Sequence, residues 1–347
     1  MAVADTMRVV IYNADLSRDG PGLLLRDILK RDDPQVQAAL TMIGAAQADV
    51  ILLTGVDYDH GLAALGALAD ALAVAGRPYP TRFALRPNTG QATGLDLDGD
   101  GRRGGPRDAQ GYGRFAGEGG MALLSRYPVD IAGVRDFSGF LWRDLPSALL
   151  PRGMAPDAMV LQRLATTGHW EIPLILPDGG RLRLLAWHAT PPVFDGPEDR
   201  NGRRNHDEAA FWQRLIDGQL PMPPPERPFI LLGDANLDPV DGDGLPAAIA
   251  GLLTHSALQD PAPRGMAALT DPAQSGDPAL DTADFTARGG PGRLRVEYIL
   301  PSADLRVTDS GVLWPENESA LAETARLASR HYPVWVEITI PIRKEHP

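Results

Sequence analysis

The segment Phe229–Gly244 reads FILLGDANLDPVDGDG and joins a short apolar run to a group of polar residues. The residues Phe229–Leu232 are typical of a buried strand, and Asp234 and Asn236 follow its end. A carboxylate can orient or deprotonate a water molecule, and a neighbouring amide can hold water or a phosphate oxygen without adding charge. An Asp/Asn turn after a core strand would give the same pattern, so this segment alone leaves a structural and a catalytic interpretation open.

The composition of the 347-residue chain narrows the classes of protein to consider. Hydrophobic residues make up 44% of the chain, which is enough for one large domain or two ordinary ones. No run of 18 apolar residues occurs, so no membrane span is expected. The net charge of −12 gives no general attraction to nucleic acid or anionic lipid, although a local basic site remains possible.

Two features bear on the compartment in which the protein works. The chain has no cysteine, which excludes disulfide and thiol chemistry without deciding the compartment. Residues Met1–Thr6 lack the apolar region of a signal peptide, and a strand-like run begins at Met7. The chain is therefore either cytoplasmic, or extracellular or periplasmic with its signal peptide removed.

The pattern of apolar residues predicts a layered α/β architecture in one domain over residues 1–347. Helices are expected at Gly61–Gly76 and Asp207–Asp217, and a Gly- and Asp-rich stretch over about 87–120 is expected to be a long loop insertion. Besides Phe229–Leu232, strands are expected at Met7–Tyr12, Val50–Thr54, Met121–Leu124, Arg183–Trp187, Arg295–Leu300 and Val334–Ile340.

Several of these expected strands carry a polar residue of catalytic type. Asn13 and His188 each end a strand, Glu297 lies inside one, and His331 precedes the last one. A lone His near a strand is more often structural, and Asn13 could cap a turn. Their occurrence together with Asp234 and Asn236 favours a shared catalytic site.

Long segments of the chain resemble the endonuclease/exonuclease/phosphatase superfamily, and in particular a bacterial, often exported branch of it. The resemblance implies a four-layer α/β/β/α sandwich, with two packed, mostly antiparallel sheets and the active site at one rim. It rests on five segments: Gly20–Leu29, Asn88–Phe115, Gly119–Val129, His188–Glu208 and Gly233–Gly244.

The same resemblance implies a role for each residue of the predicted site. Asn13 would bind a metal, a metal-bound water or the substrate, and His188 would contact the phosphate or the leaving group. Asp234 would orient or deprotonate the attacking water, and Asn236 would bind phosphate or water. His331 would contact phosphate and stabilise the transition state. Phosphoester hydrolysis needs an in-line water and donors on the non-bridging oxygens.

The chain departs from the family pattern at three positions. Gly55 stands where the family has a metal-binding Glu, and Arg330 stands where it has an Asp before the final His. Glu297 replaces an Asp, which keeps the charge and lengthens the side chain. A magnesium ion needs carboxylate oxygens, so a magnesium ion or other divalent cation at this site is in doubt. Only Asn13, Asp57 and Glu297 remain as weak candidate ligands besides Asp234.

Three hypotheses follow from these departures. In the first, Arg330 partly replaces the missing cation, because a guanidinium stays charged and binds phosphate through two nitrogens. In the second, catalysis is lost and the protein is a non-catalytic ligand-binding or interaction protein. In the third, Asp57 or Glu118 substitutes for the missing ligand; Asp57 would lie on the same strand face as Gly55.

A separate cation site is predicted in the long loop. Residues Asp96, Asp98 and Asp100 alternate with other residues and are followed by Gly101, a pattern that wraps Ca²⁺ in short loops. Arg107 stands where a helix–loop–helix calcium site would have a bidentate Glu. The sequence therefore predicts a structural Ca²⁺ over residues 96–101, with a solvated acidic turn as the alternative.

The basic residues Arg203 and Arg204 belong to a cluster that follows His188 in the chain. They are candidates for binding substrate phosphate, or they pair with the neighbouring acidic residues, as surface charges commonly do. The favoured function is hydrolysis of a phosphomonoester or phosphodiester. The substrate is expected to be a small molecule or a lipid headgroup; nucleic acid is possible but not favoured, because of the negative net charge.

Overall fold

The computed structural model describes residues 6–266, 270–316 and 318–340. One sheet has six strands in the order β12-β13-β1-β2-β4-β3, in which only β1 and β2 are parallel neighbours. Its strands are β1 (Thr6–Leu16), β2 (Val50–Val56), β3 (Thr81–Phe83), β4 (Gly120–Ser125), β12 (Val307–Val312) and β13 (Val334–Thr339).

The second sheet has five strands in the order β11-β8-β7-β6-β5, and here only β7 and β8 are parallel. Its strands are β5 (Arg135–Asp136), β6 (Gly168–Ile175), β7 (Arg181–His188), β8 (Phe229–Asp234) and β11 (Glu297–Pro301). A short antiparallel pair, β9 (Ala283–Asp284) and β10 (Arg293–Leu294), lies outside both sheets.

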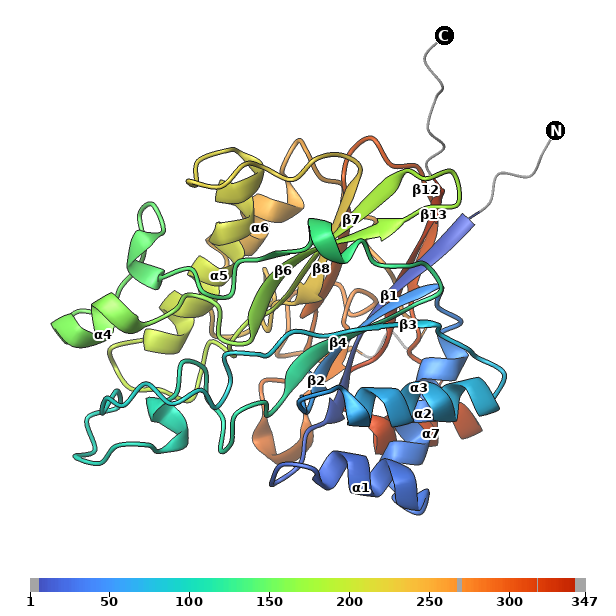
Figure 1. The fold of residues 1–347 in the computed structure, drawn as a ribbon, viewed down its shortest axis with the longest axis horizontal. Helices are drawn as coiled ribbons and strands as arrows, with labels where there is room; N and C mark the ends of the chain where they lie inside the picture. The colour runs from blue at the N-terminus through green and yellow to red at the C-terminus, as the bar shows by residue number, and fades with distance from the viewer. Residues whose placement is uncertain (1–5, 267–269, 317, 341–347) are drawn as a thin grey trace, which may run out of the picture.

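Helices cover the outer face of each sheet (Figure 1). The first sheet is covered by α1 (Leu23–Lys30), α2 (Pro34–Ala45), α3 (Ala63–Val74) and α7 (Ala320–Ala328), and the second by α5 (Arg200–Ile216) and α6 (Ala247–Leu253). The shorter helices are α4 (Pro156–Leu161), η1 (Pro106–Asp108), η2 (Ile131–Gly133), η3 (Trp142–Asp144) and η4 (Ala287–Gly289). No helix among the described residues is long and apolar enough to cross a membrane.

The two sheets pack face to face over a shared core. Ile11 and Leu52 of the first sheet belong to the same buried cluster as Ile230 and Ile299 of the second. A second cluster, which includes Phe211 and Trp212, fills the space between the second sheet and α5. The predicted four-layer sandwich with two mostly antiparallel sheets is therefore confirmed.

The buried face of α5 carries polar side chains that hold neighbouring loops in place. Arg204 donates to the carbonyl oxygens of Leu164, at 2.9 Å, and Gln110, at 2.7 Å. Asn205 donates to the carbonyl oxygen of Thr190, and Glu208 accepts from the backbone N–H of the same residue. Because Thr190 borders the cavity described below, α5 fixes one wall of that cavity.

The ends of β1 and β2 have an irregular backbone at Gly55. The pairing of the two strands shifts register after Asn13, and Gly55 has φ +65°, a left-handed conformation that favours glycine. A Cβ atom at Gly55 would lie 2.4 Å from Asn13 Oδ1. The structure therefore has no room for the Glu that the family pattern places here, unless Asn13 moves.

Replacement of Gly55 by alanine tests this steric conflict. Gly22 is the matched control, because it has φ +78° and a Cβ added there would have no heavy atom within 4 Å. We expect Gly22→Ala to lower the free energy of unfolding by roughly 1 kcal/mol, from backbone strain alone. Gly55→Ala should lower it by more than about 2 kcal/mol, in urea denaturation, because the clash adds to the strain. Equal losses would contradict the clash.

Candidate functional site

Strand register aligns three of the predicted site residues in one row. Asp234, at the end of β8, pairs with His188 of β7 on one side and with Glu297 of β11 on the other. Asn13, on β1 of the first sheet, and His331, in the segment that precedes β13, both lie next to Asp234. The structure thus brings together five residues that are far apart in the sequence.

Asp234 lies beneath the surface of this site. Its Oδ2 accepts a hydrogen bond from Asn13 Nδ2 at 2.9 Å and lies 3.5 Å from His188 Nε2. Its Oδ1 accepts from the backbone N–H of Asn236 at 2.9 Å. Burial and the charge of Glu297 raise the pKa of Asp234, and Asp234 has no exposed surface. Its carboxylate therefore contacts neighbouring side chains and does not face the cavity.

The two histidines are held in different electrostatic environments. Burial lowers the pKa of His188, and the nearby charge of Asp234 only partly offsets this. Burial would also lower the pKa of His331, but the charge and hydrogen bond of Glu297 outweigh it and raise that pKa to about 9. At neutral pH, His188 is therefore uncharged and His331 carries a positive charge.

The backbone around His331 is fixed by Ser329. The hydroxyl of Ser329 donates to the carbonyl oxygen of Asn13 at 2.7 Å and accepts from the backbone N–H of His331 at 3.1 Å. These bonds tie the segment that precedes β13 to the end of β1. The positions of His331 and Asn13 therefore depend on each other.

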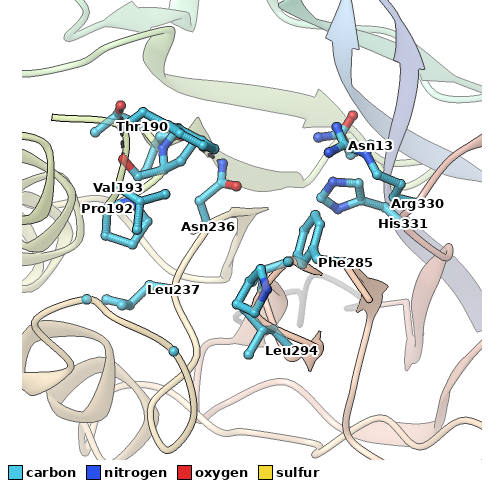
Figure 2. Close-up of a pocket in the computed structure, with 18 of the residues that line it drawn as sticks. Asn13, Thr190, Pro192, Val193, Asn236, Leu237, Phe285, Leu294, Arg330 and His331 are labelled. Atoms are coloured by element: carbon cyan, nitrogen blue, oxygen red, sulfur yellow. Dashed lines mark hydrogen bonds between the residues drawn. The ribbon is translucent and has the colours of Figure 1, made fainter. Parts of the chain in front are cut away.

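A cavity of about 820 Å³ opens next to this group. Figure 2 shows Asn13, Arg330 and His331 together at one end, and Pro192, Val193 and Leu237 at the other. His188 and Asn236 also line it, and Asn236 is held by a hydrogen bond from its Nδ2 to the carbonyl oxygen of Ala189. One cavity thus combines a polar end with an apolar wall.

Arg330 extends over the polar end of the cavity. Its Nε lies 3.4 Å from Asp15 Oδ2, and its guanidinium lies over the ring of Phe285 at 5.6 Å. The Phe285 ring also meets the ring of His331 edge-on at 5.3 Å. The sequence analysis did not predict Asp15 as a site residue. The one indication was that Asp15 lies two residues after Asn13, and residues two apart in a strand point to the same face.

The buried residues of the site include one group with the spacing of metal ligands. Asp234, Glu297 and His331 each offer one ligand atom, and these atoms lie within 4.8 Å of one another. Glu297 Oε2 is buried and has no hydrogen-bond partner. By distance alone, these three side chains could hold a cation.

The same surroundings do not fit a hydrated magnesium ion. Magnesium keeps several water molecules in an octahedral shell, but Asp234, Glu297 and His331 are 0%, 1% and 3% exposed. Gly55 supplies no carboxylate, and Asp15, the nearest further acid on β1, is paired with Arg330. The donors that remain belong to side chains that have almost no contact with solvent.

Asp57 and Glu118, the proposed substitute ligands, are already bound by the protein. Asp57 follows the end of β2 and accepts hydrogen bonds from Ser17 Oγ and from the backbone N–H of Arg18 and Gly119. Glu118 lines the cavity but is held by Arg114, which donates to both of its carboxylate oxygens. Their carboxylates therefore serve loop contacts in this structure.

Arg203 and Arg204 do not lie among the residues that line the cavity. Arg204 is buried and donates to backbone carbonyl oxygens, as described above. Arg203 donates to the carbonyl oxygen of Glu198 and lies 3.9 Å from Asp199. Both guanidinium groups are bound by other groups of the protein. The geometry therefore gives no support to the phosphate-binding role that the basic cluster predicted.

The acidic loop forms a different cluster from the one that the sequence predicted. Asp96 and Asp98 lie within ligand distance of Asp108, whereas the Asp100 carboxylate accepts a hydrogen bond from the backbone N–H of Arg102 at 2.7 Å. Asp108 directly follows Arg107, so it stands one residue beyond the expected bidentate position. The alternate spacing of Asp96, Asp98 and Asp100 in the sequence did not indicate that Asp108 joins this cluster.

Comparisons with known proteins agree with the fold described above. Among solved structures, an endonuclease/exonuclease/phosphatase from Beutenbergia cavernae matches with a TM-score of 0.53 and 18% identity, covering 96% of this chain and 71% of that one. Sphingomyelinase C from Streptomyces griseocarneus matches with a TM-score of 0.51 and 17% identity, covering 96% and 99%. At this identity, the likeness shows a shared fold.

A mannosyl-6-phosphatase from Bacteroides thetaiotaomicron matches with a TM-score of 0.50 and 16% identity, covering 96% of this chain and 99% of that one. A sequence comparison with curated proteins gave no match. The sequence model of one family, however, matches residues 12–331, which is nearly the whole chain. The chain therefore belongs to the endonuclease/exonuclease/phosphatase family.

Proposed function

We propose that the protein hydrolyses a phosphoester bond in the cavity lined by His188 and His331. The observation that carries this proposal is that these two histidines line one cavity with opposite shifts in pKa. Groups whose environments drive their pKa values apart are suited to act as base and acid in one reaction. The names of two structural neighbours, a sphingomyelinase C and a mannosyl-6-phosphatase, support phosphoester chemistry as the class.

The uncharged His188 accepts the proton of the attacking water in this scheme, and the oxygen of that water bonds to phosphorus. The ester bond to the leaving oxygen breaks, and the charged His331 gives that oxygen its proton. His188 Nδ1 is buried without a hydrogen-bond partner, so the proton is accepted at Nε2, which lies 3.5 Å from Asp234 Oδ2. Asp234 acts as a positioning residue in this scheme, because it does not line the cavity. This places the proton transfer on His188, whereas the family resemblance implies Asp234 for that role.

Arg330 supplies the positive charge that the non-bridging phosphate oxygens need. Its side chain is 60% exposed and its contact with Asp15, at 3.4 Å, is long for an ion pair, so a phosphate can displace that carboxylate. A guanidinium binds two phosphate oxygens at once. We therefore propose an altered site in which Arg330 and His331 take over charge stabilisation, and no step passes through a metal ion.

Hydrolysis of p-nitrophenyl phosphate and bis-p-nitrophenyl phosphate in the presence of EDTA tests this proposal. We expect the wild-type protein to be active on at least one of them, and Arg330→Ala to lower kcat/KM by roughly 100-fold, the usual effect of removing one donor to a developing charge. Arg326→Ala, on the exposed face of α7, is the matched control and should have no effect.

Two other outcomes would point elsewhere. Activity that appears only when Mg²⁺ is added would contradict the replacement of the cation by Arg330. Absence of activity with and without Mg²⁺, together with binding of inorganic phosphate, would support the alternative that the protein is a non-catalytic member of its family.

The pH dependence of kcat/KM should be bell-shaped. Activity should rise with pH through the lowered pKa of His188, which lies below 6.5, and should fall as His331 loses its proton at about pH 9. Because the charge of Glu297 raises the pKa of His331, Glu297→Gln should shift the falling limb to lower pH. A falling limb that does not move in this variant would rule out His331 as the acid.

We also propose that Asp96, Asp98 and Asp108 hold a structural Ca²⁺. Carboxylates from one loop are the oxygen ligands that this ion takes, and it would order the long segment between β3 and β4. We also propose that the protein is exported to the periplasm or extracellular space, with the cytoplasm as the alternative that the sequence leaves open, because calcium sites of extracellular modules work at up to about millimolar calcium.

The calcium proposal is tested by the shift in melting temperature on addition of millimolar Ca²⁺. We expect a stabilising shift in the wild-type protein, its loss in Asp108→Asn and its retention in Asp100→Asn. The comparison separates the two residues, because Asp108 lies in the cluster and Asp100 does not. If Ca²⁺ leaves the melting temperature of the wild-type protein unchanged, the calcium proposal is wrong.

A further inference from the structure

The cavity is much larger than a phosphate group requires. Its volume of about 820 Å³ lies in the range of sites that enclose a drug-sized molecule. The cationic groups gather at one end, and beyond them the wall is formed by Pro192, Val193, Leu237 and Leu294 (Figure 2). The apolar part of the cavity therefore has to accommodate something other than the reacting phosphate.

Two aromatic side chains stand exposed among the residues that line this cavity. Phe194 is 76% exposed and Tyr112 is 60% exposed, and they come from two different loops. Phe194 also has φ +73°, a left-handed conformation that is strained for a residue other than glycine. Residues with strained backbone cluster at active sites and ligand clamps.

The surrounding contacts hold Phe194 in this position. Asn201, in the first turn of α5, donates from Nδ2 to the carbonyl oxygen of Val193 at 2.7 Å. Arg107, in the loop that carries Tyr112, donates to the carbonyl oxygen of Phe194 at 3.4 Å. The two loops are thus linked directly, and their aromatic side chains belong to one built rim.

Charge within the cavity limits how many phosphates its ligand can carry. Glu118, Asp238, Asp241 and Asp243 line the cavity, whereas Arg330 is the one arginine among its described lining side chains. A second phosphate placed away from Arg330 and His331 would meet carboxylates and apolar side chains. The geometry therefore disfavours a polyanion such as a nucleic acid strand.

We propose that the apolar wall and Phe194 bind the organic group of a singly phosphorylated, apolar alkyl or aryl phosphoester. Phe194, Leu237 and Leu294 would contact this group while Arg330 and His331 hold the phosphate. This inference rests on the proposed function and names its substrate class. It assigns Phe194 as a specificity-determining residue, a role that no sequence motif indicated.

Binding of methylphosphonate, hexylphosphonate and octylphosphonate, measured by calorimetry below the micellar concentration, tests the inference without turnover. Each methylene buried is worth about 0.8 kcal/mol, so several methylenes in contact with the wall should tighten binding by well over tenfold from methyl to octyl. Phe194→Ala should reduce this ratio at least threefold. Ile131→Ala, at an exposed apolar residue outside the cavity, is the matched control and should leave the ratio unchanged.

The possible results separate this inference from the proposed function. A Kd that is the same for all three phosphonates would overturn the inference, whether or not p-nitrophenyl esters are hydrolysed. Tighter binding of a dithymidine diphosphate than of octylphosphonate would overturn it in favour of nucleic acid. A clear dependence on chain length in a protein that hydrolyses none of the test esters would support the site and contradict the proposed hydrolysis. Because Phe194 is mostly exposed, its replacement should leave folding intact.

Discussion

The hydrogen bond from Asn13 to Asp234 is the contact on which the site depends. It joins the two sheets at 2.9 Å, between residues 221 positions apart in the chain. Asp234 has no exposed surface, and a buried carboxylate without partners would cost several kcal/mol. The Asn13 amide therefore helps to keep this carboxylate inside the sandwich and joins the two sheets at their rim.

The same bond bears on the glycine at position 55. Because Asn13 Nδ2 donates a hydrogen bond to Asp234, the Oδ1 atom of Asn13 points toward Gly55. A Cβ atom at Gly55 would lie 2.4 Å from this Oδ1. The backbone there is left-handed, so glycine is favoured by its conformation as well as by the space. Asn13, Gly55, Asp15 and Arg330 therefore meet at one corner of the structure, because the backbone N–H of Asp15 donates to Asn13 Oδ1 and the Asp15 carboxylate pairs with Arg330.

The helix α5 shows where a sequence pattern can mislead. The pattern indicates a basic cluster on the surface and a helix that begins at Asp207, whereas the helix in the structure runs from Arg200 to Ile216. Arg204, Asn205 and Glu208 are buried and bind backbone groups of four loops, and burial raises the pKa of Glu208 to about 7. Hydrophobic periodicity detects the part of this helix that carries Phe211 and Trp212 but not its first turns, because the inward face there carries Arg204 and Asn205. Strand β6 was missed for a related reason, since Gly168 and Pro173 interrupt its apolar residues.

The sequence by itself determined most of the strands and a layered α/β architecture, because buried strands need apolar runs and their polar ends stand out from them. The resemblance of five long segments to a known family implied the four-layer sandwich. The sequence also identified Asn13, His188, Asp234, Glu297 and His331 one by one. Only the tertiary structure decided their arrangement: strand register places His188 and Glu297 on either side of Asp234 and covers its carboxylate. Protonation, access to the cavity and the exposed position of Phe194 depend on distances between segments that are remote in the chain, and a linear pattern carries no such distances.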